Sequence, residues 1–266
     1  MSITSGTQRS RRAPGPVADR ASLILSAGLL VGGLIAGQVV SLFHAGGITA
    51  PNNHPAIFAL YAQSGIWTAV HLGEFIAAAA TVVGLVVLYY ALNLTDGTPG
   101  LVVRLGIVTA GATLALTAVL YAVDGVVLKR AVDAWAGAPD AEKAVRFASA
   151  ETVRWLEEAT NSYQYFLTGL TVILVAALIV WTAKVPRPIG YLLGLSGVAD
   201  LVAGWIHGAA GFAPQAVLPA LLGQLCWLIA GVWLLVSAWR MAESAAIAPG
   251  GDPPARRNDG GLAARS

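Results

Sequence analysis

Six long apolar stretches constrain the fold of this chain more than any other feature of its sequence. Each is about as long as the 20 helical residues that cross a bilayer core of about 30 Å. They run over residues 21–43, 65–92, 105–128, 165–183, 188–207 and 215–239. Hydrocarbon offers no partner to backbone polar groups, and a helix satisfies them within the segment. The sequence therefore predicts an all-α integral membrane bundle of six transmembrane helices.

The composition agrees with a membrane protein. Of the 266 residues, 56% are hydrophobic and only 11% are charged, whereas soluble proteins carry roughly 25% charged residues. The net charge of +2 is small and the basic residues form no stripe, so the expected partner is the lipid bilayer and not nucleic acid. The single cysteine, Cys226, has no disulfide partner and is expected to pack as a small hydrophobe. Abundant alanine, glycine and valine are typical of a GC-rich bacterial genome.

Lysine and arginine residues predict how the bundle is oriented. They concentrate in both tails and in the loops on the same side as the tails, which indicates that both termini are cytoplasmic in a cell membrane. The first apolar stretch is longer than the core of a typical signal peptide, so we expect it to be retained. Tails 1–20 and 244–266 are rich in small residues, proline and arginine, and are expected to be disordered. The membrane domain then covers residues 21–243.

The loop between the third and fourth spans carries a further helical pattern. Apolar or small residues recur at helical spacing at Val145, Ala148, Thr152, Trp155 and Leu156. This spacing predicts an extracytoplasmic amphipathic helix that lies on the membrane surface or extends the fourth span outward. Glu157 and Glu158 are then expected to belong to a solvated face.

A few ionisable residues interrupt the apolar stretches and point to a site. An ionised group in hydrocarbon costs at least about 2.5–3.5 kcal/mol, so such residues suggest function. They are His71, Glu74, Asp124, Asp200 and His207. The predicted orientation puts all of them in the outer half of the membrane, and their helical spacing puts His71 beside Glu74 and Asp200 on the face of His207. We therefore expect a polar pocket among spans two, three and five that opens outward.

Structural interpretations of the same residues stay open. Asp124 has Lys129 and Arg130 nearby as interfacial partners, and His71 with Glu74 fits a hydrogen-bonded pair that joins helices. His44 and His54 fit ordinary loop residues. Tryptophans near membrane interfaces are common, although Trp67 and Trp205 also lie close in sequence to the pocket residues.

The leading functional hypothesis is a membrane-embedded enzyme with a hydrophobic small-molecule substrate. A carboxylic acid in a low-dielectric pocket favours its protonated form and can act as a general acid. The candidate catalytic residues are Asp200, Glu74, His71 and Asp124, and the candidate substrate contacts are Trp67, Trp205 and His207. Protonation of an isoprenoid double bond would create a carbocation that tryptophan faces stabilise. This chemistry resembles that of small membrane terpene cyclases and sterol isomerases, without a shared motif.

Two other classes of function remain open. A proton-coupled transporter is suggested by the acid and histidine on both span two and span five, which would correspond in an inverted repeat. A metal or haem held by outer histidines and carboxylates is the third hypothesis. The sequence contains no HExxH, CxxC, GxxxxGK or GxSxG motif, so no metal ligand or cofactor is assigned. A homo-oligomer also stays open.

Overall fold

The computed structural model describes residues 18–46 and 52–246, and within these ranges it is helical without strands. Six long helices dominate: α1 (Arg20–Ser41), α3 (Trp67–Ala91), α4 (Gly97–Ala122), α6 (Asp140–Thr182), α7 (Arg187–Ala210) and α8 (Val217–Ala246). Helix α4 continues through a π-helical segment, η1 (Val123–Leu128), into α5 (Lys129–Ala136). A short α2 (His54–Gln63) follows α1, and the 3-10 turn η2 (Pro214–Ala216) precedes α8.

The predicted membrane bundle is confirmed by length and composition. Within the described ranges, six helical runs are long and apolar enough to cross a membrane, and they correspond to the six apolar stretches of the sequence. The third run reaches from Gly97 to Ala136, past the boundary expected at residue 128. The tails expected to be disordered lie outside the described residues, except for residues 18–20 and 244–246; α1 begins at Arg20 and α8 ends at Ala246.

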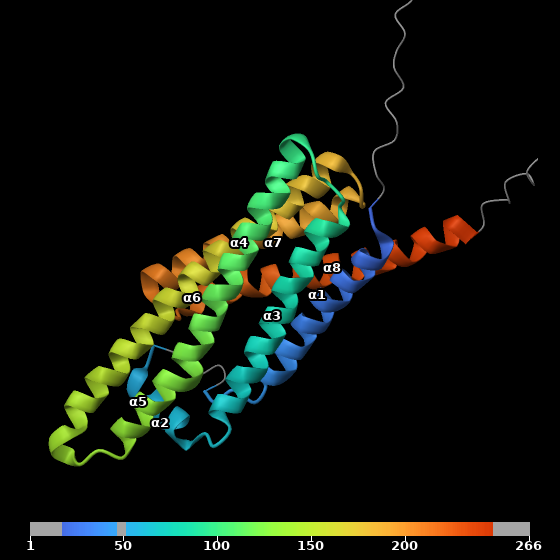
Figure 1. Ribbon diagram of the computed structural model, residues 1–266. Coiled ribbons are helices and arrows are strands. Elements are labelled where there is room, and N and C mark those ends of the chain that lie inside the picture. The colour runs from blue at the N-terminus through green and yellow to red at the C-terminus, as the bar shows by residue number, and fades with distance from the viewer. Residues whose placement is uncertain (1–17, 47–51, 247–266) are drawn as a thin grey trace, which may run out of the picture.

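The six long helices form a closed ring (Figure 1). Each packs against the next one in the chain, and α8 packs against α1 to complete the circle. One end of the ring carries α2, α5, the first turns of α6 and η2; we call it the α2 end. The opposite end holds the beginning of α1, the end of α8 and the turns that join α3 to α4 and α6 to α7. Such a ring can enclose a cavity along its axis.

Local chemistry explains where the helices turn. The Asp19 carboxylate caps α1 by accepting a hydrogen bond from the backbone amide of Ser22 at 3.1 Å, which satisfies one free donor of the first turn. Helix α6 ends at Thr182, and the next residue, Ala183, has a left-handed φ of 51°. Pro186 and Pro188 follow within a few residues, so the chain cannot continue the same helix. This short turn sets α7 antiparallel to α6.

The amphipathic segment extends the fourth span as one continuous 43-residue helix, α6. Its faces are oriented differently from the expectation of a solvated acidic face. The apolar stripe points outward, with Val145, Trp155 and Leu156 more than half exposed, whereas Glu157 is buried. Glu158, expected beside it on that face, is half-buried. In a bundle surrounded by lipid, the polar face of a helix is best satisfied by turning toward the interior.

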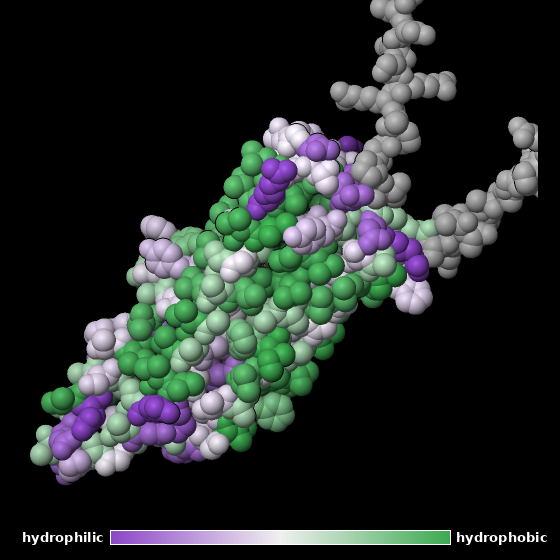
Figure 2. Space-filling view, viewed as in Figure 1, coloured by the Kyte–Doolittle hydropathy of each residue, from purple (hydrophilic) through white to green (hydrophobic). Residues whose placement is uncertain are grey.

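Apolar packing is concentrated at the end opposite α2. A large cluster of buried side chains there includes one residue from each long helix: Leu30, Leu85, Val103, Ile179, Leu193 and Leu234. A second, smaller cluster at the α2 end joins α2, α3, η1, α5 and α6 around Phe58, Tyr61 and Trp67. Figure 2 shows a mostly hydrophobic surface over the middle of the molecule, with hydrophilic residues gathered toward its two ends.

Candidate functional site

A polar cavity occupies the ring between the α2 end and the middle of the bundle. It consists of two adjoining hollows, the α2-end hollow of about 450 Å³ and the central hollow of about 320 Å³. The two lie side by side, since Glu74, Tyr121, Asn161 and Tyr165 line both. Asp200 lines the central hollow, while Asp124 and His207 line the α2-end hollow. The structure thus brings carboxyl groups from three of the apolar stretches into one space.

His71 and Asp124 form a buried contact between α3 and η1. The Nε2 atom of His71 lies 2.9 Å from Asp124 Oδ2, and its Nδ1 atom lies 2.8 Å from the Trp67 carbonyl oxygen. A carbonyl only accepts hydrogen bonds, so Nδ1 carries a proton and donates it. Nε2 therefore faces the carboxylate, and one proton is shared between these two groups. His71 is 1% exposed, which keeps the pair away from bulk solvent.

The π-helical segment η1 positions Asp124. Its wider turn releases backbone carbonyls that α3 satisfies: Trp67 Nε1 donates to the Asp124 carbonyl at 2.9 Å, and Thr68 Oγ1 donates to that of Gly125 at 3.0 Å. Gly125 lets the two helices approach closely, because a Cβ atom there would lie 2.6 Å from His71 Cβ. Single π-helical turns within α-helices are frequent at functional sites.

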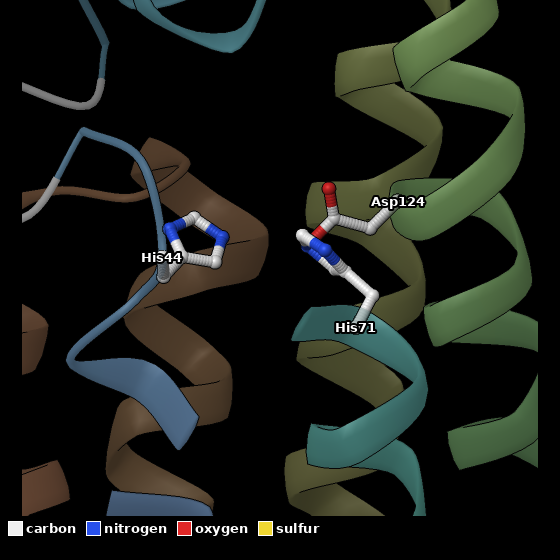
Figure 3. A group of neighbouring side chains, drawn as sticks. All are labelled: His44, His71 and Asp124. Atoms are coloured by element: carbon white, nitrogen blue, oxygen red, sulfur yellow. The ribbon is translucent and has the colours of Figure 1, made fainter. Parts of the chain in front are cut away.

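His44 completes a three-residue cluster with this pair (Figure 3). It lies in the loop after α1, and its imidazole faces His71 and Asp124 across a small space. One ligating atom from each of the three side chains lies within 4.8 Å of the others. Burial lowers the pKa of His44 below its ordinary value near 6.5, so its imidazole is neutral at pH 7 and offers a lone pair. The sequence interpretation of His44 as an ordinary loop residue is therefore replaced by a place beside the cavity.

A buried charged pair on α6 forms another wall of the α2-end hollow. Arg154 Nη1 donates to both Glu157 carboxylate oxygens, at 2.9 and 2.8 Å, and both residues are 3% exposed. The guanidinium also lies 4.3 Å from the ring centre of Phe212, within cation–π range. Nearby, His54 Nδ1 lies 2.9 Å from Glu151 Oε1 and ties α2 to α6. The solvated face expected for this helix is in fact part of the site.

Glu74 and Asp200 lie farther from the α2 end than the His71–Asp124 pair does. Glu74 is half-buried at the junction of the two hollows, one helical turn from His71 on α3. Asp200 is 7% exposed, and its Oδ2 atom is buried without a hydrogen-bond partner among the described residues. Tyr165 and Trp227 line the central hollow beside it. Within residues 18–46 and 52–246, neither of these two carboxyl groups forms an ion pair.

Of the three residues predicted to contact a substrate, two are buried and one is exposed. Trp67 is buried, and its indole packs against His71 with ring centres 4.3 Å apart, so it holds the histidine in place. His207 is 8% exposed and packs against Tyr165 and Phe212. Trp205, expected as a substrate contact, is 69% exposed on the outer surface of α7. It faces the lipid because it lies two residues from His207, on another side of the helix.

The geometry thus joins a histidine–carboxylate cluster, an arginine–glutamate pair and two deeper acids in one cavity. No known protein family matches this chain, and no curated protein or solved structure is significantly similar to it. The function must therefore be argued from the cavity itself.

The cavity residues that the sequence does not identify include a histidine and a charged pair: His44, Arg154 and Glu157. The sequence sign of this contact is the i,i+3 spacing of Arg154 and Glu157, which places the two side chains on one face of a helix. Glu157 and Glu158 are predicted on a solvated face because they fall outside the apolar part of the fourth span. His44 offered no signal, since only the folded loop brings it to α3.

Proposed function

We propose that this chain is a membrane-embedded enzyme that performs general acid/base chemistry on a lipid-like molecule of the isoprenoid kind. The observation that carries the proposal is that the polar groups of the cavity lie in one part of the ring, from the α2 end to the centre. Its acids, Glu74 and Asp200, lie inside the ring, while the other half of the ring is filled by apolar side chains. Carboxyl groups in a cavity between apolar helices are suited to proton transfer to an apolar substrate.

The apolar half favours an enzyme over a transporter. A carrier exposes its site to each side of the membrane in turn, along a path between its helices. Here the half opposite α2 is packed with buried leucine, valine and isoleucine from all six long helices. Buried acids and histidines gather in the α2-end half and the centre among the described residues.

Two glutamines support a substrate that arrives from the bilayer. Gln38 of α1 and Gln224 of α8 line the central hollow, and both are exposed. Gln38 Nε2 donates to Gln224 Oε1 at 3.2 Å, so the two amides satisfy each other at the cavity wall. A lipid-like molecule could enter the cavity between α1 and α8 by breaking this hydrogen bond.

The proposed reaction uses the cavity in two proton steps. Glu74 or Asp200, as the carboxylic acid, gives its proton to one carbon of a double bond, and the other carbon becomes a carbocation. Tyr121, Tyr165 and Trp227 line the cavity, and their aromatic rings would stabilise that cation. Loss of a proton from a neighbouring carbon to a carboxylate or to the His71–Asp124 pair then gives an isomerised or cyclised product. Atoms and charge balance without an external reactant.

We also propose that the α2 end faces outward and that both termini are cytoplasmic. The excess of lysine and arginine on the side of the tails supports this orientation. The cavity would then open toward the outside of the cell membrane. An outward opening fits a substrate that is taken from the outer leaflet.

The test is lipid profiling of cells that express the native chain or a Glu74→Gln, Asp200→Asn double variant at equal, folded abundance. Loss of a general acid lowers rates by about 10²- to 10⁴-fold. We therefore expect a lipid product that accumulates with the native chain and is absent with the variant.

The matched control is an Asp133→Asn, Glu142→Gln double variant. It also removes two carboxylates near the α2 end, but their side chains are 48% and 54% exposed and lie outside the cavity lining. The control is expected to give the native profile. Identical profiles for all three proteins would refute the enzyme proposal.

A further inference from the structure

We propose that His44, His71 and Asp124 bind one divalent transition-metal ion, such as zinc or ferrous iron, at the edge of the α2-end hollow. The inference rests on the geometry of these three side chains and does not depend on the reaction proposed above. It goes beyond the sequence, which leaves a metal held by outer histidines and carboxylates open but does not single out His44, His71 and Asp124 as one set of ligands.

The donor atoms are the right kind and nearly the right distance apart. Two imidazole nitrogens and one carboxylate oxygen are the ligands of many zinc and non-haem iron sites. Bonds of about 2.0–2.2 Å hold tetrahedral ligands about 3.4 Å apart. His71 Nε2 and Asp124 Oδ2 are 2.9 Å apart, and the His44 nitrogen is within 4.8 Å of both. A movement of His44 by little more than 1 Å closes the set, and its position in a loop permits that movement.

The surroundings of the three side chains match those of metal ligands. A ligating histidine usually donates its other ring N–H to a carbonyl or carboxylate, which fixes the ring and frees the second nitrogen. His71 does this through Nδ1 to the Trp67 carbonyl. Trp67 Nε1 in turn donates to the Asp124 backbone carbonyl. The carboxylate itself keeps one buried oxygen, Oδ1, without a hydrogen-bond partner among the described residues.

The charges in the hollow also favour a divalent cation. Among the described residues that line it, three carry carboxylates (Glu74, Asp124 and Glu157), and Arg154 carries a guanidinium. The ion would replace the proton that His71 and Asp124 share, which adds one positive charge beside the carboxylates of Glu74 and Glu157. A buried space with more carboxyl groups than cationic side chains can compensate that charge.

Three protein ligands leave a coordination position for a small molecule. Catalytic zinc sites have this composition, with water or substrate as the fourth ligand. His44 and Asp124 both line the α2-end hollow, so the free position faces that space. The ion would therefore contact the polar group of a molecule held in the cavity.

The experiment measures metal directly. Protein purified in detergent is loaded with one equivalent of Zn²⁺, passed through a desalting column and analysed for bound zinc by mass spectrometry. We expect about one zinc ion per native chain. His44→Ala and Asp124→Ala should each lower zinc retention at least tenfold, because each removes one of three ligands. His54→Ala, at a histidine of the same end outside the cluster, should retain zinc as the native chain does.

Thermal unfolding shows that lost binding is not lost folding. A ligand that binds only the folded state raises the melting temperature, so Zn²⁺ should raise that of the native chain and of His54→Ala, and a chelator should reverse the rise. His44→Ala, changed in a loop, should still melt cooperatively but without a response to Zn²⁺. Cobalt loading should give the native chain a visible spectrum of nitrogen and oxygen ligation.

Each outcome decides the inference. Native protein that retains no zinc, or equal retention in the two ligand variants, would overturn it. A metal-free protein that still changes the lipid profile leaves the proposed enzyme standing, whereas bound metal without any lipid change refutes the enzyme and supports the metal site.

Discussion

Arg154 and Glu157 are charged residues that the fold buries almost completely, each 3% exposed. Their two short hydrogen bonds compensate for the loss of water around both groups. A buried ion pair contributes little net stability compared with apolar side chains, but breaking it by removing one partner leaves an uncompensated charge. At the scale of single residues, this pair should therefore be sensitive to single changes and tolerant of a double change.

The corresponding prediction is that Arg154→Leu lowers the free energy of unfolding by about 3–5 kcal/mol. Adding Glu157→Leu in the same chain should recover part of that loss, because the fully buried carboxylate is removed while Glu158, whose Oε1 lies 3.9 Å from Arg154 Nε, remains. Unfolding in detergent, followed by circular dichroism, measures both values.

The exposed pair Glu142 and Arg146, also on α6, serves as the control. Its side chains are 54% and 51% exposed, so Glu142→Gln should change the free energy of unfolding by less than about 0.5 kcal/mol. If Arg154→Leu behaved like this control, the buried pair would have no special role in the structure.

Single residues were only partly predictable from the sequence. His71, Glu74, Asp124 and Asp200 stand out because an ionisable group in an apolar stretch is costly, and the cavity indeed contains or adjoins them. The contact between His71 and Asp124 could not be predicted, because sequence does not fix the rotation of one helix against another. The burial of Glu157 could not be predicted either, because its apolar neighbours Trp155 and Leu156 point outward from the bundle.

The join between α3 and η1 is the element that holds the cluster together. Gly125 permits this close approach, and the π-helical turn directs the Asp124 side chain toward His71. The sequence predicts the third span but gives no sign of its π-helical turn, since such turns depend on what the neighbouring helix satisfies. The sequence therefore predicts where this helix lies but not its π-helical turn or its contact with α3.

At this scale we predict that Gly125→Ala destabilises the protein by about 1–3 kcal/mol, the usual cost of overpacking. The new methyl group would press against His71 Cβ, a rigid part of the side chain, so the helices must separate. Thermal unfolding in detergent should show a lower melting temperature.

Gly111→Ala on α4 is the matched control, because a Cβ atom there meets nothing within 4 Å. It should leave stability unchanged or raise it by up to about 1 kcal/mol through better helix propensity. Equal melting temperatures for the two variants would show that the close approach at Gly125 is not required.

For the whole molecule, the ring of six helices separates a polar half from an apolar half. The number of spans and the all-α class follow from the sequence, since six apolar stretches of the right length leave few alternatives. The closed ring and its cavity do not follow, because lipid-facing and cavity-facing residues in an apolar helix are similarly hydrophobic. Only the rare acids and histidines indicate which helix faces point into the ring. They predict a site in the half of the bundle that lies toward the outside of the cell.

The central claim is that the cavity is reached from the α2 end and is closed at the other end. The most direct measurement replaces Cys226 by serine and places one cysteine at Ala78, which lines the central hollow, or at Ala230, which is 1% exposed in the apolar half. A small charged thiol reagent that cannot cross membranes is added to intact cells. The account predicts that Ala78→Cys reacts from outside and that Ala230→Cys does not react from either side. Reaction of Ala78→Cys only after the cells are opened, or equal reaction at both positions, would contradict it.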